Sequence, residues 1–430
     1  MQSTTNGIEE FSPYQKLIVA ILALLQFTVV LDFMVLSPLG DILMKSLKMT
    51  PADFGLVVSS YAFSAGISGI LAAGFADKFD RKKLLLFFYA GFILGTLCCA
   101  LANSHLMLLL ARIVTGLFGG VIGSISLAIV TDLFSVSQRG RVMGFVQMAF
   151  AVSQVLGIPL GIYLANIWGW HSAFLMIVIL GILIYAAIFF WLKPVNAHLS
   201  LQSDKNAFTH LLHTISNKSY ITAFGATALL SVGGFMLMPF GSAYLINNIK
   251  ITNQQLPLVF MLTGASSIII MPLIGRLSDK IDKFMLFCGG SALAIVMILI
   301  YTNLSPVPLW EIIVINMVLF MGIMSRMIPA TTLNTSIPEM SDRGAFMSVN
   351  SSLQQMAGGL AAITAGLIVT QKTESSPLEN YNILGIVVSV MIVACAFLVY
   401  KVSVLVKEKN ARQKPDVIPQ QPQNAVRDTV

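Results

Sequence analysis

Apolar stretches, each long enough to cross a lipid bilayer, follow one another along almost the whole chain. A transmembrane helix needs about 20 mostly apolar residues. Because only 10% of the 430 residues are charged, against roughly 25% in a soluble domain, we predict an all-α integral membrane protein. The twelve predicted spans are 17–38, 54–76, 84–103, 106–131, 142–165, 172–192, 219–247, 256–277, 284–303, 309–335, 344–370 and 381–405.

Polar segments divide these spans into two sets of six. The run that begins at Leu17 lacks a small-residue cleavage site, so we interpret it as a retained span and not as a signal peptide. The polar, proline-bearing end of the chain is expected to be disordered. The predicted divisions are an N-terminal segment (1–16), a first six-helix half (17–192), a linker (193–218), a second half (219–405) and a tail (406–430).

Basic residues predict the orientation, because cytoplasmic loops carry an excess of Lys and Arg. With both termini placed in the cytoplasm, twenty of the 26 Lys and Arg residues fall on the inner side and four on the outer side. The other two, Arg112 and Arg326, lie inside predicted spans. We therefore expect a multi-pass protein with both termini in the cytoplasm, most simply in a bacterial inner membrane.

Two charged segments of similar sequence, residues 73–83 and 275–283, each lie between two apolar spans. Their acidic residues are separated by 202 positions, which is close to half of the chain. The aligned pairs are Asp77 with Asp279, Asp80 with Asp282, and Arg81 with Lys283.

A second repeated feature supports the duplication. Arg139-Gly140 opens the fifth span and Arg343-Gly344 opens the eleventh, at an offset of 204. A charged loop and a helix start that recur at nearly one offset indicate a duplicated membrane unit. Duplicated halves with a binding site between them are the architecture of secondary transporters.

These residues resemble the major facilitator superfamily over positions 17–405. The loop at 73–83 resembles the family signature between helices 2 and 3, although Ala73 and Asp80 replace glycines. The resemblance implies twelve helices in two pseudo-symmetric halves, each built from inverted three-helix repeats. It extends to Arg112 with Gly116, Gly119 and Gly120 in the fourth span, and to the antiporter-like Gly157-Ile158-Pro159-Leu160-Gly161 in the fifth, where an isoleucine separates the glycine and the proline.

The charged loops are candidates for a cytoplasmic gate. The resemblance implies that Asp77 meets the start of the eleventh span and that Arg81 meets Asp132. In the second half, Asp279 and Lys283 occupy the matching positions. The alternative is that the basic residues of these loops only set the orientation, which leaves the repeated aspartate unexplained.

Asp32 is the acidic residue that lies deepest inside a predicted span. A carboxylate at this depth costs roughly 2.5–3.5 kcal/mol by insertion scales unless it has a partner or faces a cavity. One interpretation makes Asp32 a proton carrier that couples transport, together with Arg112. The other is a static ion pair with Arg112 or Arg326 that fixes helix packing.

The two arginines inside spans are too costly in lipid to be incidental. For Arg112 we favour a cavity position, in proton relay or anion binding. The depth of Arg326 predicts a side chain that faces the cavity and binds an anionic group. The other candidates for the substrate cavity are amide side chains at helical spacing, for which hydrogen bonds between helices are the alternative role: Gln26, Gln147, Gln154, Asn350 and Gln354.

Residues Gly157, Pro159 and Gly161 are expected to loosen or bend the fifth span, because proline lacks a backbone donor. A bend at this position would shape how the two halves meet.

The predicted function is proton-driven export of small organic molecules, drug-like or amphiphilic, by alternating access. The expected partners are a small-molecule substrate, protons and the bilayer, with no nucleic acid, and the functional unit is expected to be a monomer. No phosphate-binding loop, metal spacing or other cofactor motif is present, so we expect neither a cofactor nor enzyme activity. The alternatives are a sugar or metabolite exporter, a symporter of the same fold, and a transport-inactive receptor or scaffold.

Overall fold

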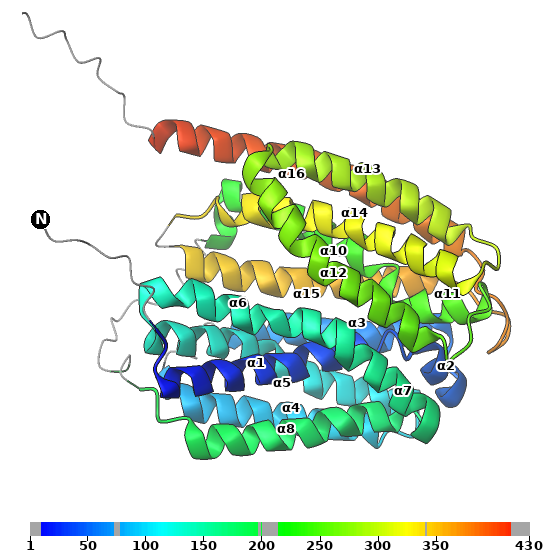
Figure 1. The fold of residues 1–430 in the computed structure, drawn as a ribbon, viewed down its shortest axis with the longest axis horizontal. Coiled ribbons are helices and arrows are strands. Elements are labelled where there is room, and N and C mark those ends of the chain that lie inside the picture. The colour runs from blue at the N-terminus through cyan, green and yellow to red at the C-terminus, as the bar shows by residue number, and fades with distance from the viewer. Residues whose placement is uncertain (1–9, 73–77, 197–198, 200–213, 340–341, 414–430) are drawn as a thin grey trace, which may run out of the picture.

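A computed structural model describes residues 10–72, 78–196, 199, 214–339 and 342–413. The described chain is a bundle of long helices arranged in two halves (Figure 1). The first half contains α1 (Pro13–Val35), α2 (Gly40–Leu47), α3 (Pro51–Ala72), α4 (Arg81–Ala100), α5 (His105–Leu133), α6 (Val136–Val152), η2 (Ser153–Gly157), α7 (Ile158–Trp168) and α8 (His171–Trp191). The second half contains α10 (Lys218–Phe235), η4 (Met238–Phe240), α11 (Gly241–Asn247), α12 (Leu256–Lys280), α13 (Lys283–Thr302), α14 (Leu309–Thr335), α15 (Arg343–Ile368) and α16 (Tyr381–Gln413).

Most helices begin and end within a few residues of the predicted spans. Among the described residues, eleven helical segments are long and apolar enough to cross a membrane. The twelfth, α15, has 26 residues but carries a polar face that includes Asn350 and Gln354. It packs inside the bundle against α3, where Gly55 and Gly66 allow its backbone to approach closely.

The ends of the helices follow from local sequence. Ser12 caps α1 in a reciprocal arrangement with Gln15. Asp80 caps α4 by accepting a hydrogen bond from the backbone N–H of Lys83, and Asp282 caps α13 in the same way through Phe284 and Met285. The aligned residues Asp80 and Asp282 of the duplicated loops therefore cap the N-terminus of the corresponding helix in each half.

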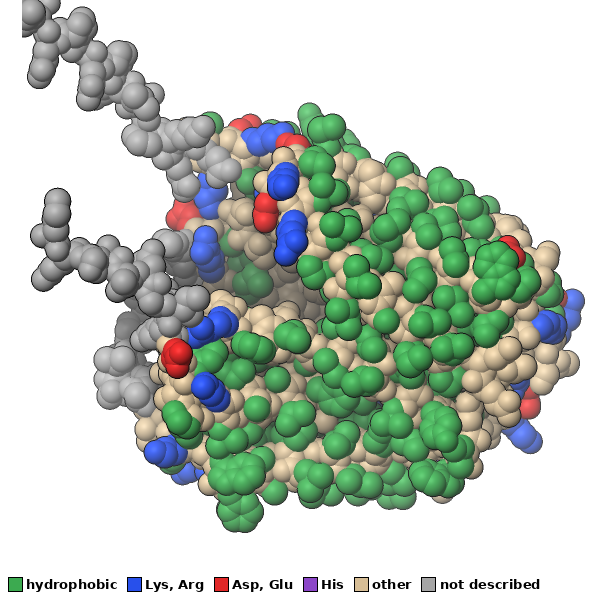
Figure 2. All heavy atoms as spheres, viewed as in Figure 1, with side chains coloured by type: hydrophobic (Ala, Val, Ile, Leu, Met, Phe, Trp, Pro, Cys, Tyr) green, Lys and Arg blue, Asp and Glu red, His purple; other side chains and the backbone are tan. Residues whose placement is uncertain are grey.

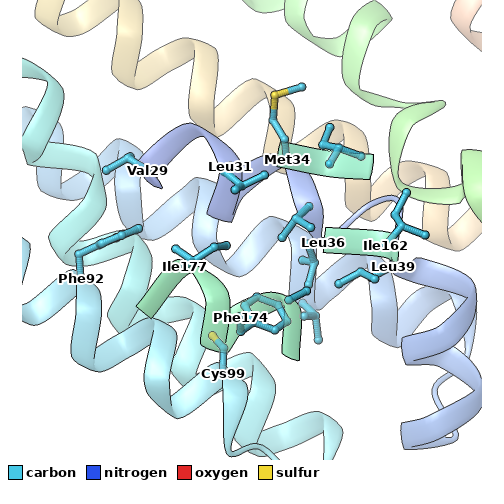
Figure 3. Close-up of a cluster of buried hydrophobic side chains, with 14 of the residues drawn as sticks. Val29, Leu31, Met34, Leu36, Leu39, Phe92, Cys99, Ile162, Phe174 and Ile177 are labelled. Atoms are coloured by element: carbon cyan, nitrogen blue, oxygen red, sulfur yellow. The ribbon is translucent and has the colours of Figure 1, made fainter. Parts of the chain in front are cut away.

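Helix α1 begins and α16 ends at the same end of the bundle, on the left in Figure 1, which we call the terminal end. At the other end, residues from α1 and the turn after it pack on α7 and α8. Figure 3 shows Leu36 and Leu39 gathered with Ile162, Phe174 and Ile177 in this buried apolar cluster.

The fifth span is loosened where the sequence predicts it. Residues Ser153–Gly157 form a π turn, in which the backbone N–H of Ile158 bonds to the carbonyl of Ser153. Pro159 directly follows the π turn, at the start of α7, and it supplies no N–H to the helix there. Gly157 and Gly161 face α1, since a Cβ atom on them would meet the side chains of Leu31 and Val35.

Three features of the helices differ from the predicted spans. The short helix α2 and the break at η4 were not predicted, and the tail does not begin at residue 406. Helix α16 continues to Gln413, so residues 406–413 are helical. The Lys409 ammonium explains the extension, because it donates to the carbonyl oxygens of Ser336, Ile337 and Pro338 after α14.

Candidate functional site

A cavity of ≈ 250 Å³ lies between the two halves. It is lined by α1, α6, η2 and α7 from the first half, and by α10, η4, α11, α12, α13, α14, α15 and α16 from the second. Figure 2 shows the surface hollowed between the halves near the terminal end. The wall is mostly apolar and includes the aromatic side chains Phe33, Phe150, Phe235, Phe260 and Phe320.

The opposite end is closed by polar contacts between the halves. The Asn247 amide of α11 donates to Asp41 of α2 at 2.6 Å, and Asp41 also pairs with Lys45 of its own helix at 2.8 Å. The Asn166 amide of α7 donates to the carbonyl oxygen of Asn253 at 2.8 Å. With one end joined and the other hollowed, the cavity opens toward the terminal end.

Four of the predicted cavity residues line this cavity: Gln154, Arg326, Asn350 and Gln354. Two do not. Gln147 lies two turns from Gln154 toward the terminal end and is exposed. Gln26 is half-buried on α1, about two turns before Phe33, and its side chain is not part of the lining. Helical spacing alone placed both on the correct helices, but it did not give the depth at which the cavity begins.

A polar network that the sequence analysis did not identify lies in the cavity wall. The Thr227 hydroxyl donates to the Oδ1 atom of Asn350 at 2.7 Å, and the Nδ2 atom of Asn334 donates to Thr227 at 2.9 Å. The Oδ1 atom of Asn334 has no hydrogen-bond partner within the described part of the chain. Thr227 and Asn334 are polar residues within apolar helices, and this feature of the sequence could have identified them as candidates.

Asp32 is completely buried and pairs with Arg112, with 2.6 Å between Oδ2 and Nη1. The Thr96 hydroxyl donates to its other oxygen at 3.3 Å. The Arg112 guanidinium lies 4.4 Å from the centre of the Tyr61 ring. The structure thus joins Asp32 to Arg112 and not to Arg326.

This pair lies inside the first half, behind the cavity wall. Neither Asp32 nor Arg112 lines the cavity, but Phe33, the next residue of α1, does. The rings of Phe33 and Tyr61 are 5.5 Å apart. An aromatic layer therefore separates the ion pair from the cavity.

Arg326 lies in α14 with 1% of its surface exposed, and it is one of the residues that line the cavity. Its centre is 5.8 Å from the Phe287 ring. In the part of the chain that the structure describes, neither its Nε nor its Nη2 atom has a hydrogen-bond partner.

The glycines that follow Arg112 serve helix packing. A Cβ atom on Gly116 or Gly120 would meet the backbone of α3 at Tyr61 or Ala65. The side of α5 that carries these glycines therefore lies directly against α3.

The charged loops lie at the terminal end. The Nε atom of Arg81 is 3.4 Å from the Oδ2 atom of Asp132. Asp77 falls outside the described residues. In the second half, Asp279 is exposed and Lys283 is half-buried.

Asp282, beside them, pairs with Lys407 at 2.9 Å. The hydrogen bond from the Lys407 ammonium holds the pKa of the Asp282 carboxyl below its usual range.

Across the described residues, no group of three His, Cys, Asp or Glu side chains is placed to hold a metal ion.

Two halves of long apolar helices around a cavity that is open at one end define a membrane transporter. The sequence profile of the Major Facilitator Superfamily matches residues 22–362 and 223–424. The chain belongs to this family, and the predicted fold of twelve transmembrane helices in two pseudo-symmetric halves is confirmed.

Similar proteins are themselves transporters. An uncharacterized MFS-type transporter of Bacillus subtilis, YbcL, is 24% identical over 86% of this chain and 93% of its own length. A probable sugar efflux transporter of Helicobacter acinonychis is 24% identical over 60% of this chain and 64% of its own. The solved inward-facing structure of a bacterial homologue of the human lysosomal transporter Spinster has a TM-score of 0.73 at 16% identity, over 93% and 99% of the two chains.

Proposed function

We propose that this chain exports small organic molecules, drug-like or amphiphilic, in exchange for protons by alternating access. The observation that carries the proposal is the buried Asp32–Arg112 pair, which adjoins the cavity through Phe33. A carboxylate and a guanidinium held together at this depth form a site whose charge state can bias two conformations.

Protonation of Asp32 supplies the coupling. In the charged form, Arg112 compensates the carboxylate, and both are fully buried. Protonation removes this compensation and leaves the guanidinium with an unbalanced charge, which is costly at that depth. The helices α1 and α5 then favour an arrangement in which Arg112 finds another partner. Because Phe33 follows Asp32 on α1, that movement reaches the cavity wall.

The gates follow from the contacts at the two ends. We take the terminal end as cytoplasmic, since most of the basic residues lie there. Arg81 with Asp132 joins the start of α4 to the end of α5, and Asp77 lies shortly before Arg81 in the sequence. Asp279 and Lys283 occupy the matching positions in the second half. These residues form the proposed cytoplasmic gate.

The cluster of Asp41, Lys45 and Asn247 is the proposed outer closure. The π turn at Gly157, with Pro159 and Gly161, sets the course of α7 toward that closure.

A sugar or metabolite exporter is the second candidate, favoured by the name of the Helicobacter relative. The hydrogen-bonded residues Thr227, Asn334 and Asn350 would suit a hydroxyl-rich substrate. The aromatic wall favours the amphiphilic substrate, because apolar rings gain from burying apolar area.

The proposed setting is a bacterial inner membrane, with both termini in the cytoplasm and the monomer as the functional unit. No enzyme activity is proposed, since the family and the relatives named above are transporters. A receptor or scaffold without transport would keep its biological output in the Asp32→Asn variant, whereas an exporter would lose it.

Proton release on addition of candidate substrates to purified protein in weakly buffered solution tests the proposal. Wild-type protein should release protons with at least one member of a broad panel, and Asp32→Asn should not. Glu408→Gln, which removes an exposed carboxylate of α16, is the matched control and should behave as wild type. Undiminished release from Asp32→Asn, or none from wild type, would refute proton coupling through Asp32.

A further inference from the structure

The cavity contains a charge without a counter-charge. Among its described lining residues, Arg326 is the single charged side chain, and no carboxylate is present. The Nε and Nη2 atoms of its guanidinium, although buried, have no hydrogen-bond partner there. Its close neighbours are the Phe287 ring and the Cys395 sulfur, which accepts a hydrogen bond from the guanidinium, and neither the ring nor the thiol carries an opposing charge.

The first half shows what a buried arginine ordinarily requires. Arg112, also 1% exposed, has the Asp32 carboxylate at 2.6 Å. An unpaired buried ion is strongly destabilising, and a guanidinium presents a planar fork of donors that fits a carboxylate. The described cavity wall supplies no carboxylate for Arg326, so a bound molecule is the remaining source of a counter-charge.

A glycine of the neighbouring helix leaves room beside the guanidinium. A Cβ atom on Gly233 of α10 would lie 3.1 Å from the Nη1 atom of Arg326. With glycine at this position, the end of the side chain has room beside α10. The aromatic side chains Phe235, Phe260 and Phe320 belong to the same wall, so a bound molecule meets a cation and an apolar surface together.

We propose that the cavity selects amphiphilic organic anions, whose acidic group pairs with Arg326 and whose apolar part lies on the aromatic wall. This inference rests on the proposed function, because it takes the cavity as the substrate site. It narrows the substrate class, since an organic cation would meet an unopposed positive charge and gain no ion pair.

Equilibrium binding to purified protein in nanodiscs tests the proposal with four naphthalene probes of one shape. These are 2-naphthoate and 2-naphthalenesulfonate, the cation 2-naphthyltrimethylammonium, and the neutral 2-naphthalenemethanol. Wild-type protein should bind both anions more tightly than the cation and the alcohol. Arg326→Gln should weaken anion binding by about ten- to hundredfold, the loss of a charge-assisted hydrogen bond, and leave the affinity for the alcohol unchanged.

Two further variants keep the test specific. Arg276→Gln removes the same charge from an exposed position of α12 outside the cavity lining and should bind as wild type. Gly233→Ala should weaken binding of the anions more than that of the alcohol, because it crowds the guanidinium without removing it.

Equal affinity of wild-type protein for anion and cation, anions bound no better than the alcohol, or an unchanged preference in Arg326→Gln would overturn the proposal. The proposal on the substrate class can be tested separately from proton coupling, because equilibrium binding needs no proton gradient. If proton release does not depend on Asp32 while the anion preference depends on Arg326, the coupling mechanism fails and the assignment of the substrate class stands.

Discussion

Each half of the molecule buries one arginine in its fourth long helix, but the two arginines have opposite surroundings. Arg112 of α5 is paired with Asp32 behind the cavity wall, and Arg326 of α14 faces the cavity without a protein counter-charge. The duplication is therefore kept in the backbone, where Asp80 and Asp282 cap equivalent helices. It is not kept in the buried charges. Under the proposed function, the first half would carry the proton-coupling pair and the second half the group that binds the substrate.

The largest expected effect comes from breaking the pair in the first half. Asp32→Asn should abolish proton-coupled transport and lower the free energy of unfolding by about 3–5 kcal/mol, because it leaves the Arg112 charge buried without compensation. Transport into proteoliposomes and thermal unfolding measure the two effects. The double variant Asp32→Asn/Arg112→Gln should regain most of the stability but no coupling. A double variant as unstable as Asp32→Asn would show that the ion pair is not the cause.

Replacing the buried arginine by glutamine should have opposite effects on the stability of the two halves. Arg326→Gln removes a buried charge that no described side chain balances, so the midpoint of thermal unfolding should stay the same or rise. Arg112→Gln should lower it, because Asp32 then loses its partner. Thermal unfolding of both variants in the same nanodiscs checks this, and equal destabilisation by the two would remove the contrast between the halves.

Packing of the helix that carries Arg112 should be the next effect in size. Gly116→Ala places a Cβ atom against the backbone of Tyr61, and overpacking of this kind costs about 1–3 kcal/mol. Gly123→Ala on the same helix is the matched control, since no atom lies within 4 Å of its Cβ position. The midpoint of thermal unfolding should fall for the first variant only. Because alanine favours a helix more than glycine does, a similar fall in both variants would show that contact with α3 is not the cause.

The smallest effects should come from the capping aspartates that the halves share. Asp80→Ala and Asp282→Ala should each cost about 1 kcal/mol, the usual value of an N-cap. Lys407 lowers the pKa of Asp282, so its contribution is complete above the ordinary Asp pKa of about 4 and is lost as the pH falls through the lowered value. The stability difference between wild type and Asp282→Ala should therefore shrink on strong acidification, as unfolding at a series of pH values can show. A difference that does not change with pH would exclude the carboxylate as its source.

Much of the fold could be predicted from the sequence because apolar length and loop charge act over whole segments. The twelve spans, the duplicated loops and the choice of Asp32, Arg112 and Arg326 as special residues required no contact information. The partner of Asp32 could not be predicted, because depth in a span does not fix which side of a helix faces which neighbour. The partner of Asp32 is determined by the packing of α1 against α4 and α5, which supply Thr96 and Arg112.

Local irregularities were the other part that the sequence left open. The short helix α2 and the helical extension to Gln413 depend on contacts with distant residues, such as Asn247 for α2 and the carbonyl groups after α14 for α16. The positions of Gln26 and Gln147 outside the cavity depend on where the two halves diverge, which periodicity within one helix does not contain.

The π turn at Ser153–Gly157 has a consequence for movement. A π turn holds one residue more than a regular turn, and each residue turns an α-helix by about 100°. Conversion of this turn to a regular one would rotate α7 relative to α6 by roughly that angle. Asn166 lies on α7 and bonds to Asn253 across the two halves, and such a rotation would carry it away from that partner. The contact that closes this end of the cavity therefore depends on how far α7 is rotated about its axis. A change of hydrogen-bond register within this one turn would alter that rotation.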